Sequence, residues 1–279
     1  MKFAIKSIVA AAAFAAAGLS NAVPFNLAVS EFTTSMGWHA GELSGTADWN
    51  FSRDLVGLLN VGSFGIGQPT QVASVAPAVT STTFKPAPRQ TRYSTISVAA
   101  PVQSFTGAFD GTSASVYGIQ TKGGVAFTAD ADDFVSDGGF LAITNLRVDL
   151  VGKKIYADLN GDHGLGVKTN VAMWDISTVV GATSFVAASG INTLSNSLTG
   201  LKLNTNAFAM FSQAMGLTND GENALHSVRE FGTINTTISI ASVPEPSVYA
   251  MIGMGLLVIG AVGRRRKASM SLPTKTHVG

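Results

Sequence analysis

The sequence predicts a mainly β protein: an antiparallel β-sandwich or curved barrel with one or two short helices, plus an N-terminal signal helix and a C-terminal transmembrane helix. Between its two apolar ends the chain is rich in Ser, Thr, Gly, Val and Ala. Short segments in which apolar and polar residues alternate recur there, separated by Gly, Asp and Asn. Evenly spaced short strands of this kind are typical of sandwiches and barrels.

The clearest strand runs from Phe140 to Leu150, where apolar and polar positions alternate with a period of two. Residues 151–154 are suited to a turn, and residues 155–159 return as the partner strand, so a hairpin is predicted. We predict further strands at 102–109, 113–120, 123–129, 166–175 and 232–241.

Two segments favour helices instead of strands. Between Asn206 and Met215, the side chains of Phe208, Phe211 and Met215 fall on one helical face. A second helix is predicted at 222–229.

The N-terminus has the three parts of a signal peptide. Lys2 and Lys6 form a basic start, and residues 8–19 form an Ala-rich apolar stretch. Ser20-Asn21-Ala22 has the small-x-small pattern of a cleavage site, so cleavage is expected after Ala22. We therefore expect signal peptidase and the export machinery to act on residues 1–22.

The C-terminus carries a second apolar segment, followed by a basic run. Residues 248–263 are uncharged and, at 1.5 Å per residue, form roughly 24 Å of helix, which is short against the roughly 30 Å hydrocarbon core of a bilayer. Long basic side chains and local thinning make up such a deficit. Because Lys and Arg stay on the cytoplasmic side, the body is expected outside and the basic stop inside. The stop consists of Arg264, Arg265, Arg266 and Lys267.

A stiff acidic motif precedes this segment. Pro244 and Pro246 flank Glu245, and each proline fixes its φ angle and removes a backbone donor. Glu245 is therefore expected on an extended, accessible segment just outside the membrane.

The order Val-Pro-Glu-Pro-Ser, short apolar helix and Arg-Arg-Arg-Lys resembles the PEP-CTERM sorting signal of exported proteins in exopolysaccharide-producing Gram-negative bacteria. The resemblance covers about 25 of the 279 residues. It implies that Pro244, Glu245 and Pro246 are the recognition motif and that an exosortase is the partner. It also implies a membrane-anchored precursor with a periplasmic body, delivered later to the cell surface or matrix. Residues 268–279 depart from the pattern, because such signals usually end soon after the cations.

The chain is thus divided into a signal peptide (1–22), an exported body (23–243), a sorting signal (244–267) and a short cytoplasmic tail (268–279). Within the body, residues 69–101 hold five of the nine prolines and few large apolar residues. This composition predicts a loop or linker there. We favour one domain with a long excursion over two subdomains.

The exported body is mildly acidic and lacks cysteine. Residues 23–243 contain 18 − 7 = 11 Lys and Arg against 17 − 1 = 16 Asp and Glu, a net charge of −5. Nucleic acid is therefore not an expected partner, because phosphate binding needs clustered cations. The absence of cysteine excludes disulfides and thiolate metal sites.

Two polar clusters could hold calcium. The second, formed by Asp130, Asp132, Asp133 and Asp137, is more typical of a solvated loop between strands. The first is the stronger candidate. Asp158, Asn160 and Asp162 place oxygens at alternate positions, as in the first half of a calcium loop. The match then fails, because His163 stands where that loop needs glycine and Thr169 where it needs glutamate. A turn without an ion explains the same residues and is the favoured interpretation. No cofactor is expected, and calcium is the only ion left open.

The body offers no catalytic motif. It has three histidines in no metal-ligand spacing and no serine in a G-x-S-x-G elbow. We expect no enzyme, with a glycan- or ester-hydrolysing activity as the alternative. The leading hypothesis is an exported structural or interaction protein of the cell surface or exopolysaccharide matrix. The runner-up is a surface module that binds calcium, haem or a polysaccharide.

Overall fold

The computed structural model describes residues 22–29, 33–35, 38–61, 68–85, 92–132, 134–187 and 190–242. The predicted signal helix and the predicted transmembrane helix lie outside these residues. Within the described part of the chain, no helix is both long enough and apolar enough to cross a membrane.

The protein is mainly β, as predicted, and the described residues form fourteen strands in one antiparallel sheet. The strands are β1 (Val23–Ala28), β2 (Thr33–Ser35), β3 (Trp38–Phe51), β4 (Gln71–Val75), β5 (Val79–Lys85), β6 (Arg92–Phe109), β7 (Ser113–Thr121), β8 (Gly124–Asp132), β9 (Ser136–Asp149), β10 (Lys154–Gly161), β11 (Gly166–Gly181), β12 (Ser184–Val186), β13 (Gly190–Leu203) and β14 (Gly232–Ser242). The helices are α1 (Arg53–Leu59), α2 (Thr205–Ala214) and α3 (Asn219–Ser227).

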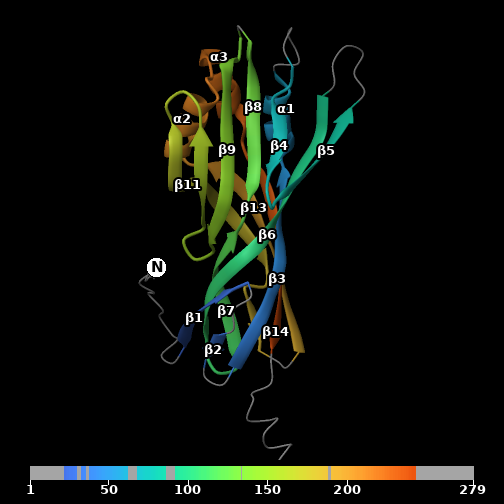
Figure 1. Ribbon diagram of the computed structural model, residues 1–279, viewed down its shortest axis with the longest axis vertical. Coiled ribbons are helices and arrows are strands. Elements are labelled where there is room, and N and C mark those ends of the chain that lie inside the picture. The colour runs from blue at the N-terminus through green and yellow to red at the C-terminus, as the bar shows by residue number, and fades with distance from the viewer. Residues whose placement is uncertain are drawn as a thin grey trace, which may run out of the picture.

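The sheet curves until it closes on itself. Eight strands follow one another as hydrogen-bonded neighbours in the order β7, β6, β3, β14, β13, β11, β10, β9. The ring closes because β9 pairs in turn with β7, through Gly118–Asp149, Ile119–Val148 and Gln120–Arg147. The strands are long and twisted, so the ring is elongated along its axis (Figure 1). Of the two predicted alternatives, the curved closed sheet is the one observed.

The predicted elements agree with the observed ones. The hairpin at 140–159 is β9 and β10, and the five further predicted strands correspond to β6, β7, β8, β11 and β14, although the third was predicted to begin one residue before β8. The two predicted helices are α2 and α3. A third helix, α1, adds to the one or two expected. Ser52 caps it, because its Oγ accepts a hydrogen bond from the Leu55 N–H at 3.0 Å.

The predicted loop at 69–101 needs correction, because β4, β5 and the first part of β6 lie within it. The described prolines lie beside strands or within one and do not mark an absence of strands. Pro86 and Pro88 lie outside the described residues. Pro69 precedes β4, and Pro77 lies between β4 and β5. Pro101 lies where β6 leaves its pairing with β3 and begins its pairing with β7. The Pro101 carbonyl still accepts a hydrogen bond from the Lys122 N–H at 3.0 Å.

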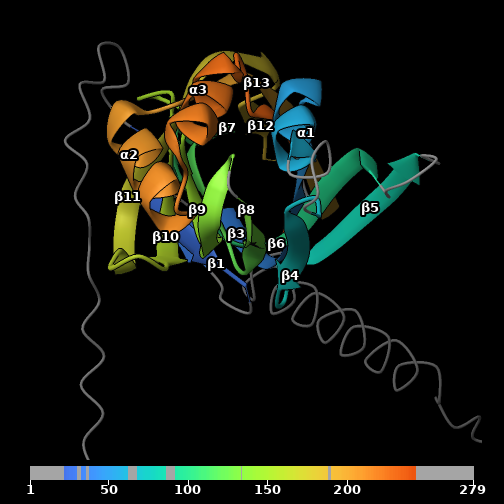
Figure 2. The same cartoon turned by 90° about the horizontal axis from the view of Figure 1, so that it is seen from above.

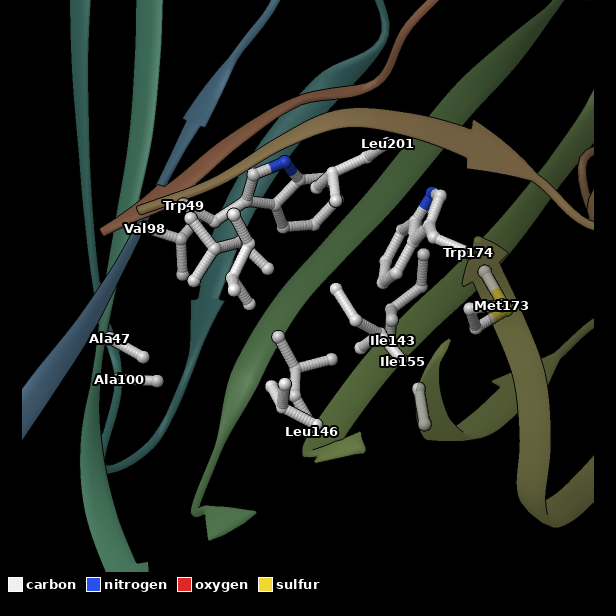
Figure 3. Packing of buried hydrophobic residues seen from close by; sticks show 14 of the residues in the cluster. Ala47, Trp49, Val98, Ala100, Ile143, Leu146, Ile155, Met173, Trp174 and Leu201 are labelled. Carbon is white, nitrogen blue, oxygen red and sulfur yellow. The ribbon is translucent and has the colours of Figure 1, made fainter. Parts of the chain in front are cut away.

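The ring interior is filled by buried apolar side chains, most of them aliphatic, with Trp49 and Trp174 among them (Figure 3). Trp49 on β3 and Trp174 on β11 meet edge to face, with ring centroids 4.9 Å apart. Trp49 also contacts Phe51 at 4.3 Å, and contacts at 6.0 and 6.1 Å extend this chain through Phe127 to Phe211 on α2. The aromatic chain therefore ties the ring to the helices.

The two ends of the ring differ. The three helices lie at one end, together with the β8–β9 turn (Figures 1 and 2). We call this the helix end. At the opposite end β1, β7 and β13 begin, and β6, β12 and β14 finish. We call this the tail end, because the chain leaves it toward residue 243.

The two tryptophans should respond differently to replacement by Phe. The Trp49 Nε1–H donates to the Phe231 carbonyl at 3.1 Å, whereas the buried Trp174 Nε1 has no hydrogen-bond partner. Trp49→Phe leaves a buried carbonyl unsatisfied, so we expect it to lower the free energy of unfolding by about 1 kcal/mol more than Trp174→Phe. Urea unfolding of residues 23–243 measures both. A larger loss for Trp174→Phe would contradict the packing described.

Candidate functional site

The sorting motif joins the folded body without a linker. β14 is paired on both sides up to its last residue, because Ser242 lies opposite Gly190 of β13 and Ala40 of β3. Pro244 follows only two residues later. Any enzyme that acts on the motif therefore has to work beside the end of the sheet.

The predicted signal cleavage site lies beside a strand as well. Ala22 is the residue before β1, and Val23, the first residue expected after cleavage, begins that strand. The other predicted sorting residues lie outside the described part of the chain: Pro244, Glu245, Pro246, Arg264, Arg265, Arg266 and Lys267.

Asp158, the first candidate metal ligand, is bound by protein N–H groups. Both of its carboxylate oxygens accept from the Arg147 guanidinium at 2.9 Å. Oδ1 also accepts from the Asn170 backbone N–H, and Oδ2 from the Asn145 side-chain amide, each at 3.0 Å. This side chain is 17% exposed. The carboxylate is therefore satisfied by four donors from two neighbouring strands.

These contacts hold two β-bulges. On one side of β10, Ala157 faces two residues of β9, Asn145 and Leu146. On the other side, Asp158 itself faces Thr169 and Asn170 of β11. Asn145 and Asn170 have φ angles of 53° and 56°, which asparagine tolerates better than most residues. Asp158 thus fastens the two strands where each carries an extra residue.

Charge and hydrogen bonding favour the ionised form of Asp158. Burial alone raises the pKa of a carboxyl. Here the hydrogen bonds from Arg147, Asn170 and Asn145 outweigh burial, so the pKa of Asp158 lies below its ordinary value. The group remains an anion that neutralises Arg147.

Asn160 and Asp162 are exposed and lie beyond this cluster, in β10 and in the turn to β11. His163 holds that turn in place, because its Nε2 lies 2.7 Å from the Gly138 carbonyl and its own carbonyl accepts from Gln213 of α2 at 2.8 Å. Over the described residues, no three His, Cys, Asp or Glu side chains gather as a metal site would require.

A cleft of about 30 Å³ opens at the helix end. Its apolar wall includes Leu59, Phe211 and Met215, and Asp130 and Asp132 lie on its polar side. Asp132 Oδ1 accepts from the backbone N–H groups of the next turn and is occupied there. The volume suits about two water molecules, far less than the roughly 300 Å³ or more of a small-molecule site. This cleft does not fit a haem.

Sequence reasoning missed an ordered polar grid on the outer face of β13, β14 and β3. The strand register sets three side chains abreast in each of three rows. The rows are Thr193–Ser239–Ser44, Ser195–Thr237–Thr46 and Ser197–Asn235–Asp48. Period-two Ser and Thr in each strand was the available signal, but only the register shows that the rows align.

Comparison with known proteins identifies the tail alone. Residues 242–267 match the PEP-CTERM protein-sorting motif. No curated protein and no solved structure matches the chain. The motif implies that an exosortase sorts and processes the chain, and therefore that the protein is exported and associated with the cell surface.

Removing the Asp158 charge should destabilise the fold. We expect Asp158→Asn to lower the free energy of unfolding at pH 7 by about 1.5–3 kcal/mol, because Arg147 loses its charged hydrogen-bond partner. The lowered pKa means that this contribution is complete above about pH 4, the ordinary Asp value, and is lost as the pH falls through the folded-state pKa. The difference between wild type and variant should therefore shrink in acid.

Urea unfolding of residues 23–243 between pH 7 and pH 2 tests this. Asp175→Asn is the matched control, because Asp175 pairs with Lys154 at 2.5 Å in a much more exposed position. Its loss should be smaller. Equal effects of the two variants would show that Asp158 does not fasten the bulges.

Proposed function

We propose that this protein is a structural or interaction component of the cell surface or exopolysaccharide matrix. It is exported by an N-terminal signal peptide, held by the C-terminal helix as a precursor and released or transferred by exosortase processing. The sorting motif at 242–267 is the observation that carries this proposal, because it addresses the chain to the surface.

The polar grid supports an interaction role for the body. Seven of its nine side chains carry hydroxyl groups, and the other two are Asn235 and Asp48. Adjacent rows share one face because side chains alternate along a strand. Such a face offers donors and acceptors at regular spacing to the hydroxyl groups of a polysaccharide. Its low charge suits a neutral or weakly charged glycan.

The proposed role is non-catalytic. The strongest polar cluster in the described body, around Asp158, is used to hold two β-bulges. The described cleft at the helix end has space for water but not for a sugar ring.

Replacing Pro244-Glu245-Pro246 with three alanines should leave export intact and stop tail processing. The stiff, acidic recognition segment is lost, while the apolar helix and the basic stop remain. Immunoblotting of the native host should then show the full-length form accumulating in the membrane fraction. The control replaces Pro273-Thr274-Lys275 with three alanines, beyond the basic stop. Equal mobility and release of both variants and wild type would contradict the proposal.

The grid should contribute to retention in the matrix. In the test variant Ser195→Ala/Thr237→Val/Thr46→Val, the central row loses its hydroxyl groups while each side chain stays compatible with a strand. We expect more of this variant in the culture medium and less in the matrix fraction, measured by quantitative immunoblotting after normal processing.

The matched control removes the same three hydroxyl groups outside the grid, at exposed positions, in Ser81→Ala/Thr128→Val/Thr169→Val. It should partition as wild type does. If both variants are retained equally, the grid is not the contact face, whereas sorting by the tail would be unaffected by that result.

A further inference from the structure

Both segments predicted to enter the membrane join the body at its tail end. β6 pairs with β3 up to Pro101, which lies opposite Thr46, and then pairs with β1. Eight residues further toward the tail end, β6 reaches Phe109, which pairs with Val23, and β3 reaches its first residue, Trp38. Ser242 pairs with Ala40, two residues from that level. Residues 23 and 242 therefore leave the sheet at the same end.

The tail is too short to hold the body far from a bilayer. From Ser242 to Val248, where the apolar helix is predicted to begin, the chain advances six residues. Fully extended, six residues span about 20 Å. The headgroup region takes up about 6 Å of this distance. The tail end of the body therefore lies within reach of the lipid surface whenever the helix is inserted.

Three exposed apolar side chains lie on strands at this end. Ile191 is 78% exposed and lies one residue inside the start of β13, opposite Ala241. Val186, the last residue of β12, is 64% exposed, and Val23, the first residue of β1, is 41% exposed. By register, Val23 lies opposite Phe109, Val186 opposite Ser113 and Ile191 opposite Ala241, so all three lie at the tail end. We call them the apolar rim.

The same end lacks basic residues. The strand segments 23–28, 38–46, 104–109, 113–116, 184–186, 190–195 and 236–242 contain no Lys or Arg. Glu42 lies among them, and Asp110 in the β6–β7 turn. Attraction to anionic lipids therefore cannot hold this end, whereas apolar insertion between zwitterionic headgroups needs no cation.

We propose that, while the C-terminal helix is inserted, the tail end of the body rests on the outer face of the bilayer with the apolar rim among the lipid headgroups. The inference rests on the proposed membrane-held precursor. Lipid is the occupant favoured by the short tail, because the tail brings the rim to the surface in every inserted molecule. A second copy in the same membrane would meet the sides of the ring and not its end.

The absence of cysteine permits single-site labelling of the full-length chain. The protein is reconstituted in phosphatidylcholine vesicles after Ile191→Cys and labelling with an environment-sensitive fluorophore. The matched control is Val167→Cys, which is 70% exposed and lies at the helix end beside the β10–β11 turn. We expect a several-fold higher emission at 191 than at 167, and quenching at 191 alone by lipids carrying a spin label on the headgroup.

Flotation of the vesicles separates the two proposals. If the full-length chain does not float with the vesicles, the membrane-held precursor itself is wrong. If the chain floats but both labels give equal emission, the precursor stands and the lipid contact of the rim is overturned. Emission at 191 that persists in detergent and rises with protein concentration would assign the rim to a second copy. Emission at 191 that requires added exosortase would assign the apolar rim to that enzyme. A contact with a second copy or with exosortase would overturn the lipid contact.

Discussion

The fold depends on β14, the last strand of the described body. It lies between β3 and β13 and is hydrogen-bonded to both along its length. Without it the eight-stranded ring is an open, curved sheet with two long unpaired edges. Its pairing with β3 joins residues nearly 200 positions apart, so the final closure of the ring is a non-local event. The body can therefore finish folding only after the chain has been made as far as residue 242.

The filled interior makes this closure favourable. Trp49 comes from β3 and Trp174 from β11, and these strands flank the pair formed by β14 and β13. Their contact, and the aromatic chain that continues to α2, can form only when the strands between them are in place. Asp158 stabilises the sheet that surrounds this interior, because it fixes the bulges that let β9, β10 and β11 bend. Apolar packing inside and one charged cluster in the wall thus shape the same curve.

Much of this architecture could be predicted from local pattern. The alternation from Phe140 to Leu150 predicted β9 correctly, because one face of that strand is buried. The spacing of Phe208, Phe211 and Met215 predicted α2 correctly, because these side chains face the core. Residues 79–99 escaped prediction because Thr and Ser dominate β5 and prolines stand nearby. The structural role of Asp158 could not be predicted from the sequence either. Its partner Arg147 is eleven residues away across a hairpin whose bulge shifts the register. The polar grid likewise depends on the register of three strands that are distant in sequence.

The position of β14 also determines how the body would bear force. In the proposed membrane-held form, the body is pulled along the axis of its final strand. In antiparallel pairs the hydrogen bonds lie perpendicular to the strands, so this pull loads both ladders of β14 in shear, with all the bonds sharing the load at once. A terminal strand at a sheet edge would carry the same pull on one ladder instead of two. The arrangement suits a protein whose attachment point must withstand flow at the cell exterior.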